Sequence, residues 1–440
     1  MIDMVPRYIL FMLVLTFIFM QLTTPSFAQE TTINAIPLPI GSGARALGQG
    51  GAFIAVADDA TAASWNPGAL TQLERPELSV VGSFLSTHQD FDPGDTGFSL
   101  GDEDVSRGDL NYFSIAYPLK IFGKNLVAAL SYQQKFDFHM KIDFDQTLVN
   151  PLDQSITQQE IDFESKGGVG ALTPAISMLV LPKLSIGVAV NFYTDEFFGN
   201  FAWKEKTQIR ATSPTSTDTV DAHLTFKNFQ AVNVTTGLLL DIWEKEDKRL
   251  TFGAVYHTPY EATVDRVTDN VFIISSERFS DRRREPFTVD YPMSAGAGFG
   301  FRYNDALLFS MDMTWTDWSE FEQKNEDTGE KSLPLGGVPT DREIDDTYAV
   351  RFGTEYLIFR QKVIIPIRGG AFYDPRPSLD DPIDIYGFGV GSGIAFKRLS
   401  IDGAYQFRWA NDADGEDFGL AGTHFDITEH LFLASIIVYF

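Results

Sequence analysis

Apolar and polar side chains alternate with a period of two along most of this chain, and charged residues occupy many of the polar positions. In 399–409, for example, Ile401 and Tyr405 fall on one face of an extended strand. Asp402 and Arg408 fall on the other face. A soluble sheet rarely turns charges towards its core, because an unpaired buried charge is costly. The pattern therefore favours an all-β transmembrane barrel, apolar outside and polar inside.

The alternation recurs in fourteen segments from residue 77 onward, an even number that suits a closed antiparallel bacterial barrel. Long and short connections alternate between them, and in such barrels short turns face the periplasm and long loops the exterior. The expected strands are 77–90, 108–119, 124–138, 164–180, 183–197, 220–241, 249–262, 286–303, 305–319, 346–358, 361–373, 385–396, 399–409 and 428–440. The expected long loops are 91–107, 139–163, 198–219, 263–285, 320–345, 374–384 and 410–427.

The N-terminus reads as a signal peptide over 1–28. Arg7 precedes the short apolar run from Ile9 to Met20, and small residues flank a cleavage position after Ala28. An anchoring helix is the alternative, but the run is short for a membrane span. The chain has no cysteine, so a lipid anchor and a disulfide framework are both excluded.

Residues 29–76 lack the alternation and are rich in glycine and alanine. So few large apolar side chains could hardly form a separate core. We interpret 29–76 as a plug, or hatch, folded into the lumen of a barrel that spans 77–440.

The net charge of −26 argues against a nucleic-acid partner, whose phosphates require lysine and arginine. The acidic residues gather in the long loops, where they are either simply solvated or bridge to lipopolysaccharide through divalent cations. The six histidines are scattered, and no HExxH or GxSxG motif occurs. We expect no enzymatic activity, no metal site and no cofactor.

Three stretches together resemble the FadL/OmpP1/TodX family of outer-membrane transporters for hydrophobic compounds. They are Gly43–Leu70 in the plug, Trp315–Phe321, and Arg368–Pro375 followed by Tyr386–Gly391. The resemblance implies a fourteen-stranded barrel with an N-terminal hatch that takes up hydrophobic molecules without an energy source of its own. Capture at the outer surface, transfer to an apolar pocket and local movement of the hatch are the implied steps.

The resemblance also implies gating residues in the hatch. Members of the family carry an Asn-Pro-Ala motif there, and this chain has Asn66, Pro67 and Gly68 after Trp65. Proline fixes one backbone angle and asparagine caps or turns the chain, so the pair predicts a sharp bend inside the lumen; an ordinary surface turn is the alternative. Because Gly68 permits more backbone freedom than alanine, it leaves the local geometry open.

Two further sets of residues are candidates for binding a ligand. An aromatic group in an outer loop would form a landing groove for hydrophobic solutes, or would merely pack the loop against its neighbours. Arg351 and Arg408 face the lumen by alternation, where they either pair with Asp312, Glu355 and Asp402 or receive a ligand carboxylate. The aromatic group consists of Phe197, Phe198, Phe201 and Trp203.

The sequence thus predicts an outer-membrane protein of a Gram-negative bacterium that takes up hydrophobic small molecules, with long-chain fatty acids as the leading substrate. A scaffold or accessory of a secretion system and a non-specific porin are the alternatives. The expected partners are outer-membrane lipid, lipopolysaccharide and, during assembly, the barrel-assembly machinery, which would recognise the last strand ending at Phe440. A monomer is expected because a barrel closes on itself.

Overall fold

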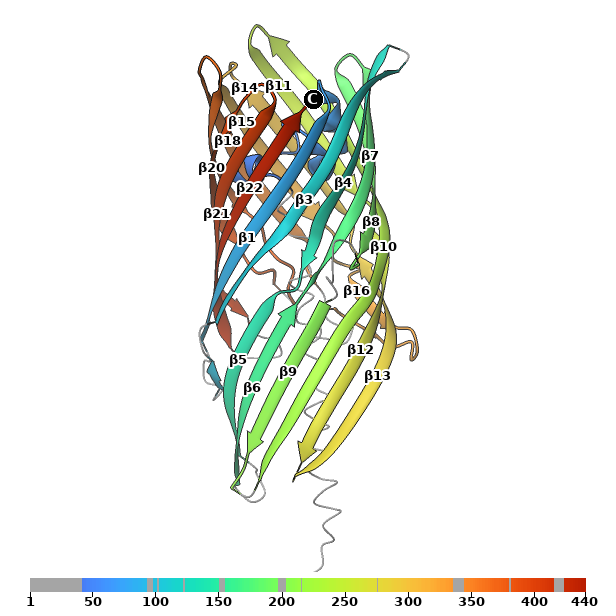
Figure 1. Ribbon diagram of the computed structural model, residues 1–440, viewed down its shortest axis with the longest axis vertical. Coiled ribbons are helices and arrows are strands. Elements are labelled where there is room, and N and C mark those ends of the chain that lie inside the picture. Colours follow the sequence, from blue (N-terminus) through green and yellow to red (C-terminus); the bar gives the residue numbers. More distant parts are fainter. Residues whose placement is uncertain are drawn as a thin grey trace, which may run out of the picture.

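The computed structural model of this 440-residue chain describes most of the sequence beyond the N-terminus. Strands make up most of the described chain (Figure 1). No helix within the described residues is long and apolar enough to cross a membrane. The expected signal peptide and the first part of 29–76 lie outside the described residues, which are 42–92, 98–100, 103–121, 123–149, 155–196, 203–214, 216–274, 276–334, 344–379, 381–414 and 423–440.

Fourteen antiparallel strands close into a barrel, as predicted. The first strand pairs with the last in an unbroken register from Glu77 opposite Tyr439 to Asp92 opposite His424. In order around the barrel the strands are β1 (Glu77–Asp92), β3 (Glu103–Ile121), β4 (Lys124–Asp137), β7 (Gly168–Leu181), β8 (Leu184–Thr194), β10 (Thr217–Lys245), β11 (Lys248–His257), β14 (Ser294–Arg302), β15 (Leu307–Thr316), β18 (Thr347–Phe359), β19 (Ile364–Tyr373), β20 (Tyr386–Ala395), β21 (Leu399–Asp414) and β22 (His424–Tyr439).

The two faces of the wall are as the alternation predicted. Ile401 is 43% exposed on the outside, whereas its neighbour Asp402 is 5% exposed on the inside. On β18, Phe352 faces outward, and Arg351 and Glu355 are buried inside. An outer surface of phenylalanine, isoleucine and tyrosine suits a lipid environment, in which exposed apolar side chains lose nothing.

The short turns lie at one end of the barrel with the C-terminus, at the top of Figure 1. The long connections lie at the other end, which we call the outer end. The prediction of loops at 139–163, 198–219 and 263–285 is wrong for the described residues. They form strands that extend the wall far beyond the barrel: β5 (Met140–Val149), β6 (Ile156–Lys166), β9 (Trp203–Thr212), the first half of β10, β12 (Tyr260–Ile274) and β13 (Glu277–Tyr291).

This extension, which we call the outer sheet, also explains the misplaced strand boundaries. The expected strand 286–303 is the end of β13 followed by β14, with a break at Pro292 and Met293. The expected strand 249–262 likewise joins β11 to the start of β12. Alternation continues through these junctions, so a local pattern did not separate them. Three short strands complete the sheet: β2 (Phe98–Leu100), β16 (Glu322–Asn325) and β17 (Lys331–Ser332).

Residues 42–76, which we call the plug segment, lie inside the barrel (Figure 1). They contain two short helices, α3 (Ala44–Gly48) and α4 (Ala62–Trp65), and a 3-10 helix, η1 (Pro67–Gln72). Glycines on the wall let the two backbones approach closely. A β-carbon on Gly187 of β8 would overlap the Pro67 carbonyl and lie 2.6 Å from the Gly68 nitrogen. Small residues therefore meet small residues at this contact.

Candidate functional site

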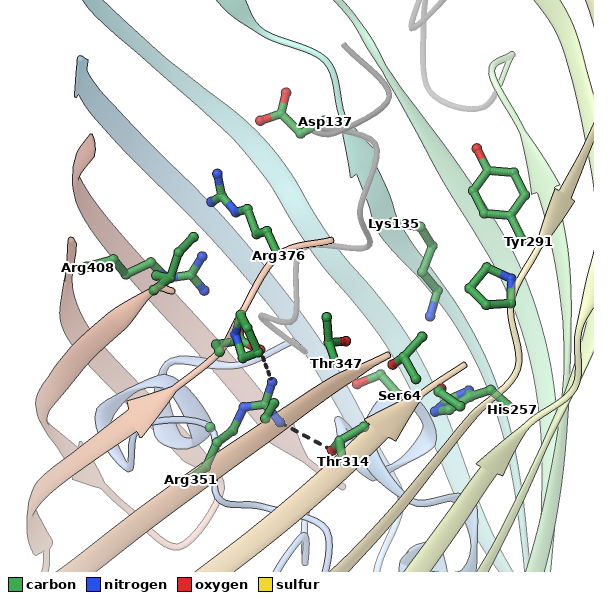
Figure 2. Close-up of a pocket in the computed structure, with 18 of the residues that line it drawn as sticks. Ser64, Lys135, Asp137, His257, Tyr291, Thr314, Thr347, Arg351, Arg376 and Arg408 are labelled. Carbon is green, nitrogen blue, oxygen red and sulfur yellow. Dashed lines mark hydrogen bonds and ion pairs between the residues drawn. The ribbon is translucent and has the colours of Figure 1, made fainter. Parts of the chain in front are cut away.

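A cavity of about 280 Å³ lies between the plug segment and the strand ends that lead into the long connections (Figure 2). Trp65 and Ser64 of the plug segment form part of its floor. Tyr193, His257 and Thr316, at or next to the outer ends of their strands, contribute to its walls. The volume is near the lower end of the range typical of small-molecule pockets. Within the described residues, no group of histidine and acidic side chains could hold a metal ion.

The Asn66-Pro67-Gly68 turn directly follows Trp65, which lines the cavity floor, and is buried. Asn66 accepts a hydrogen bond from the Gly68 nitrogen at 3.0 Å through its side-chain oxygen. Its amide nitrogen donates to the carbonyls of Ile54 and Leu238, each at 2.9 Å. Asn66 thus ties two parts of the plug segment to the barrel wall, and Pro67 begins η1 directly after it.

The position of Gly68 requires glycine because there is no room for a side chain, and not because of an unusual backbone conformation. A β-carbon there would lie 2.7 Å from the carbonyl oxygen of Gly237 on β10, closer than side-chain carbons normally pack. The residue occupies the position where the family motif has alanine, and the tight contact with Gly237 shows why this chain has glycine.

The other predicted hatch residue, Trp65, is half-buried. Its indole nitrogen donates to the Ser42 carbonyl at 3.0 Å, and its ring meets Phe53 edge-on at 5.8 Å. Both contacts lie within the plug segment, so they fix the ring as part of the cavity floor.

A buried ion network joins the plug segment to the wall. Glu355 of β18 accepts hydrogen bonds from Arg45 of the plug segment at 2.9 and 3.0 Å. It also accepts one from Arg368 of β19 at 2.7 Å. Arg368 reaches on to Asp402 of β21 at 2.6 Å, and Arg45 also pairs with Asp58. The inward-facing Glu355 and Asp402 therefore pair with Arg45 and Arg368, and this network joins the plug segment to the barrel wall.

Arg351 and Arg408 both line the cavity, so the structure brings the two candidate arginines together. Each is already engaged. Arg351 donates to Asp374 at 2.8 Å and to Thr314 at 3.3 Å. Arg408 contacts Glu429 at 3.4 Å, a carboxylate that it shares with the neighbouring Arg376.

Of the four aromatic residues assigned to a landing groove, Phe197, Phe198 and Phe201 lie outside the described residues. Trp203 begins β9 and is buried in the outer sheet, where it stacks on Phe138 at 4.4 Å and on Phe226 at 3.9 Å. Its indole nitrogen donates to Ser165 at 3.0 Å. Trp203 thus packs against its neighbours, and it lines a small apolar cavity of about 30 Å³.

A cluster of aromatic rings separates that small cavity from the main one. Tyr291 lines both cavities. Its ring stacks on Phe136 at 5.2 Å and on Tyr260 at 4.9 Å, and Tyr260 stacks on Tyr193 at 4.9 Å. These residues come from β4, β8, β12 and β13, so sequence spacing did not indicate that they meet. Only their position at the ends of alternating segments could have suggested it.

The wall has a break in backbone pairing beside the main cavity. β3 pairs with β4 only from Tyr112 to Ile121, although it pairs with β1 as far as Glu103. The bulge residue Asn111 marks the point of separation. Among the described residues, Arg107 on the β3 side pairs with Asp137 at the end of β4, across this break.

We expect Arg107→Gln to speed amide hydrogen exchange in 103–111 by roughly tenfold, with little change in 112–121. The reason is that a hydrogen bond to a charged partner contributes about 1.5–3 kcal/mol, and here it closes an edge of β3 with which no described strand pairs on that side. Arg210→Gln, which removes an exposed pair with Glu160 on the outer sheet, is the matched control. Unchanged protection of 103–111 in Arg107→Gln would show that the pair does not hold the break closed.

Comparison with known proteins gives a consistent result. Residues 26–427 match the family described as outer membrane protein transport protein (OMPP1/FadL/TodX). No curated protein sequence matches significantly.

Among solved structures, a Pseudomonas aeruginosa FadL homologue is 15% identical with a TM-score of 0.61, covering 91% of this chain and 98% of that one. The Pseudomonas putida toluene transporter TodX is 12% identical with a TM-score of 0.59, covering 92% and 100%. The Ralstonia pickettii toluene transporter TbuX is 14% identical with a TM-score of 0.52, covering 91% and 98%. At these identities the structural likeness concerns the fold. The family match extends from before the plug segment almost to the end of the barrel, and the chain is therefore a member of the FadL/OmpP1/TodX family of outer-membrane transport proteins.

Proposed function

We propose that this chain carries hydrophobic small molecules, long-chain fatty acids foremost, across the outer membrane of a Gram-negative bacterium. Movement is passive, and the plug segment gates it through Trp65 at the cavity floor and the adjoining turn of Asn66, Pro67 and Gly68. The main support for this proposal is that the plug segment occupies the lumen of a closed barrel. The main cavity lies on the outer side of the plug segment, against aromatic rings. A pore for polar solutes needs an open lumen, without a plug segment that closes it.

The two cavities suggest the inward route. An apolar chain entering the outer sheet would meet Trp203, Phe226 and Phe229 first, and would then pass Tyr291 into the main cavity. Each methylene moved from water into apolar surroundings gains about 0.8 kcal/mol. The break between β3 and β4, beside the main cavity, would then offer a lateral exit into the membrane once the Arg107–Asp137 pair opens.

Aromatic hydrocarbons are the second candidate, because TodX and TbuX are described as toluene transporters. The flat, stacked rings of Tyr193, Tyr260 and Tyr291 would suit such a solute. The main cavity, however, also exposes arginine, lysine and carboxylate groups. A molecule with one apolar end and one polar end fits this mixed lining better than toluene does.

The end of the last strand and the apolar outer surface support a proposal for assembly and partners. Phe440 directly follows the last strand, β22, is 71% exposed, and donates from its nitrogen to the Pro76 carbonyl at 3.0 Å. We propose that the barrel-assembly machinery recognises this end, that lipid and lipopolysaccharide surround the wall, and that the mature chain is a monomer.

The purified protein in lipid nanodiscs is expected to bind radiolabelled hexadecanoate saturably and glucose not at all. In planar bilayers it is expected to show no steady ionic conductance, because the plug segment fills the lumen. High steady conductance with glucose flux would instead establish a non-specific porin. Absence of both ligand binding and flux would favour a scaffold or secretion accessory.

A further inference from the structure

Lys135 differs from the other basic residues of the main cavity. Arg351 forms an ion pair with Asp374, and both Arg376 and Arg408 form ion pairs with Glu429. Among the residues that the structure describes, the Lys135 ammonium group has neither a hydrogen-bond nor an ion-pair partner. Figure 2 shows its side chain directed into the cavity, towards Ser64 and His257.

The backbone explains how a lysine comes to point there. Pairing between β4 and β7 shifts register at this residue: Gln134 lies opposite Gly170, and Phe136 lies opposite Val169. Lys135 is the extra residue of this bulge. A bulge redirects a side chain and locally ends the pairing of a strand. On its other side β4 has already separated from β3, so Lys135 stands at the inner mouth of the break in the wall.

The nearest carboxylate in sequence is not available to this lysine. Asp137 pairs with Arg107 and lies 2.7 Å from the His139 ring nitrogen, and Figure 2 shows it at the opposite side of the cavity from the Lys135 ammonium. A partly buried charge without a partner is unfavourable. A ligand that brings a negative charge would remove this penalty, whereas a neutral hydrocarbon would leave it.

We propose that Lys135 receives the anionic head of an amphiphilic acid, such as a fatty-acid carboxylate, while the apolar tail lies along the Tyr193, Tyr260 and Tyr291 rings. This inference rests on the proposed function and assigns its substrate class. The arginines named from the sequence then keep the cavity in shape, and Lys135 selects the acid. Because Lys135 also stands at the break, it holds the head where the tail can reach the membrane.

The test compares two ligands that differ only in the head, hexadecanoate and hexadecan-1-ol, bound to the full barrel in nanodiscs. Lys135→Met is expected to weaken hexadecanoate binding about tenfold, equivalent to about 1.4 kcal/mol, and to leave hexadecan-1-ol binding within about twofold. Lys135→Arg, which keeps the charge, should retain most of the affinity for the acid. Lys204→Met, an exposed lysine of β9, is the matched control.

The outcomes distinguish failure of the role proposed for Lys135 from failure of the proposed function. Equal weakening of both ligands by Lys135→Met, with no rescue in Lys135→Arg, would assign Lys135 a structural role and overturn the inference. Unchanged binding of both ligands would overturn it as well, while leaving the proposed function intact. If the unmodified protein bound neither ligand, the proposed function itself would fail, and the inference with it.

Discussion

Gly187→Val is expected to unseat the plug segment and turn a closed barrel into a conducting one. The new side chain would occupy the space of the Pro67 carbonyl and the Gly68 nitrogen. Both obstacles are backbone atoms, which cannot rotate away as a side chain can. Overpacking of this kind costs about 1–3 kcal/mol or more. A shift of that size raises the unseated population by roughly 5- to 150-fold.

The measurement is steady single-channel current in planar bilayers, recorded beside the unmodified protein. Barrel assembly should persist, because β8 keeps its backbone pairing with β7 and β10. Gly369→Val is the matched control, since a β-carbon at Gly369 would meet no atom of the described residues within 4 Å. Equal currents from both variants, or no current from Gly187→Val, would contradict a plug segment seated through this contact.

Glu355→Gln should lower the free energy of unfolding by about 3–5 kcal/mol, the cost of breaking a buried ion pair by removing one partner. Glu355 is 2% exposed and receives both Arg45 and Arg368. The substitution removes the negative charge that two buried guanidinium groups share. It also turns the NH2 group of the new glutamine towards one of the two guanidinium groups, so that two hydrogen-bond donors face each other.

Urea unfolding in lipid vesicles measures this effect. Glu160→Gln is the control, because the Glu160–Arg210 pair is exposed on the outer sheet and is expected to contribute at most about 1 kcal/mol. Destabilisation of Glu355→Gln no larger than that of the control would show that the network does not stabilise the barrel.

The barrel was predictable because its signal is local. Whether Ile401 faces lipid and Asp402 faces the lumen follows from one residue being next to the other on an extended strand. The alternation of short and long connections predicted, from the order of the segments alone, that the two kinds lie at opposite ends of the barrel, as they do. The outer sheet was missed because polar residues on its solvent face made 139–163 and 263–285 look like loops.

The candidate site was predictable only in part. Alternation placed Arg351 and Arg408 in the lumen, and both line the cavity. It suggested Asp312, Glu355 and Asp402 as carboxylate partners, whereas the structure pairs Arg351 with Asp374 and Arg408 with Glu429, which lie in other parts of the chain. Trp203 was predicted to bind a ligand because several aromatic residues lie near it in the sequence. Only the fold shows that its ring is packed within the outer sheet.

The sequence by itself determined the kind of wall this protein has: fourteen two-faced strands, apolar towards lipid and charged towards the lumen. The tertiary structure decided what the inside does with those charges. Packing of the plug segment against β18 pairs Arg45 with Glu355. The register of β4 against β7 places Lys135 at a bulge, where it has no partner among the residues that the structure describes. The physical reason is one of range. The direction of a side chain depends on its immediate neighbours, whereas its partner depends on which distant strand lies beside it.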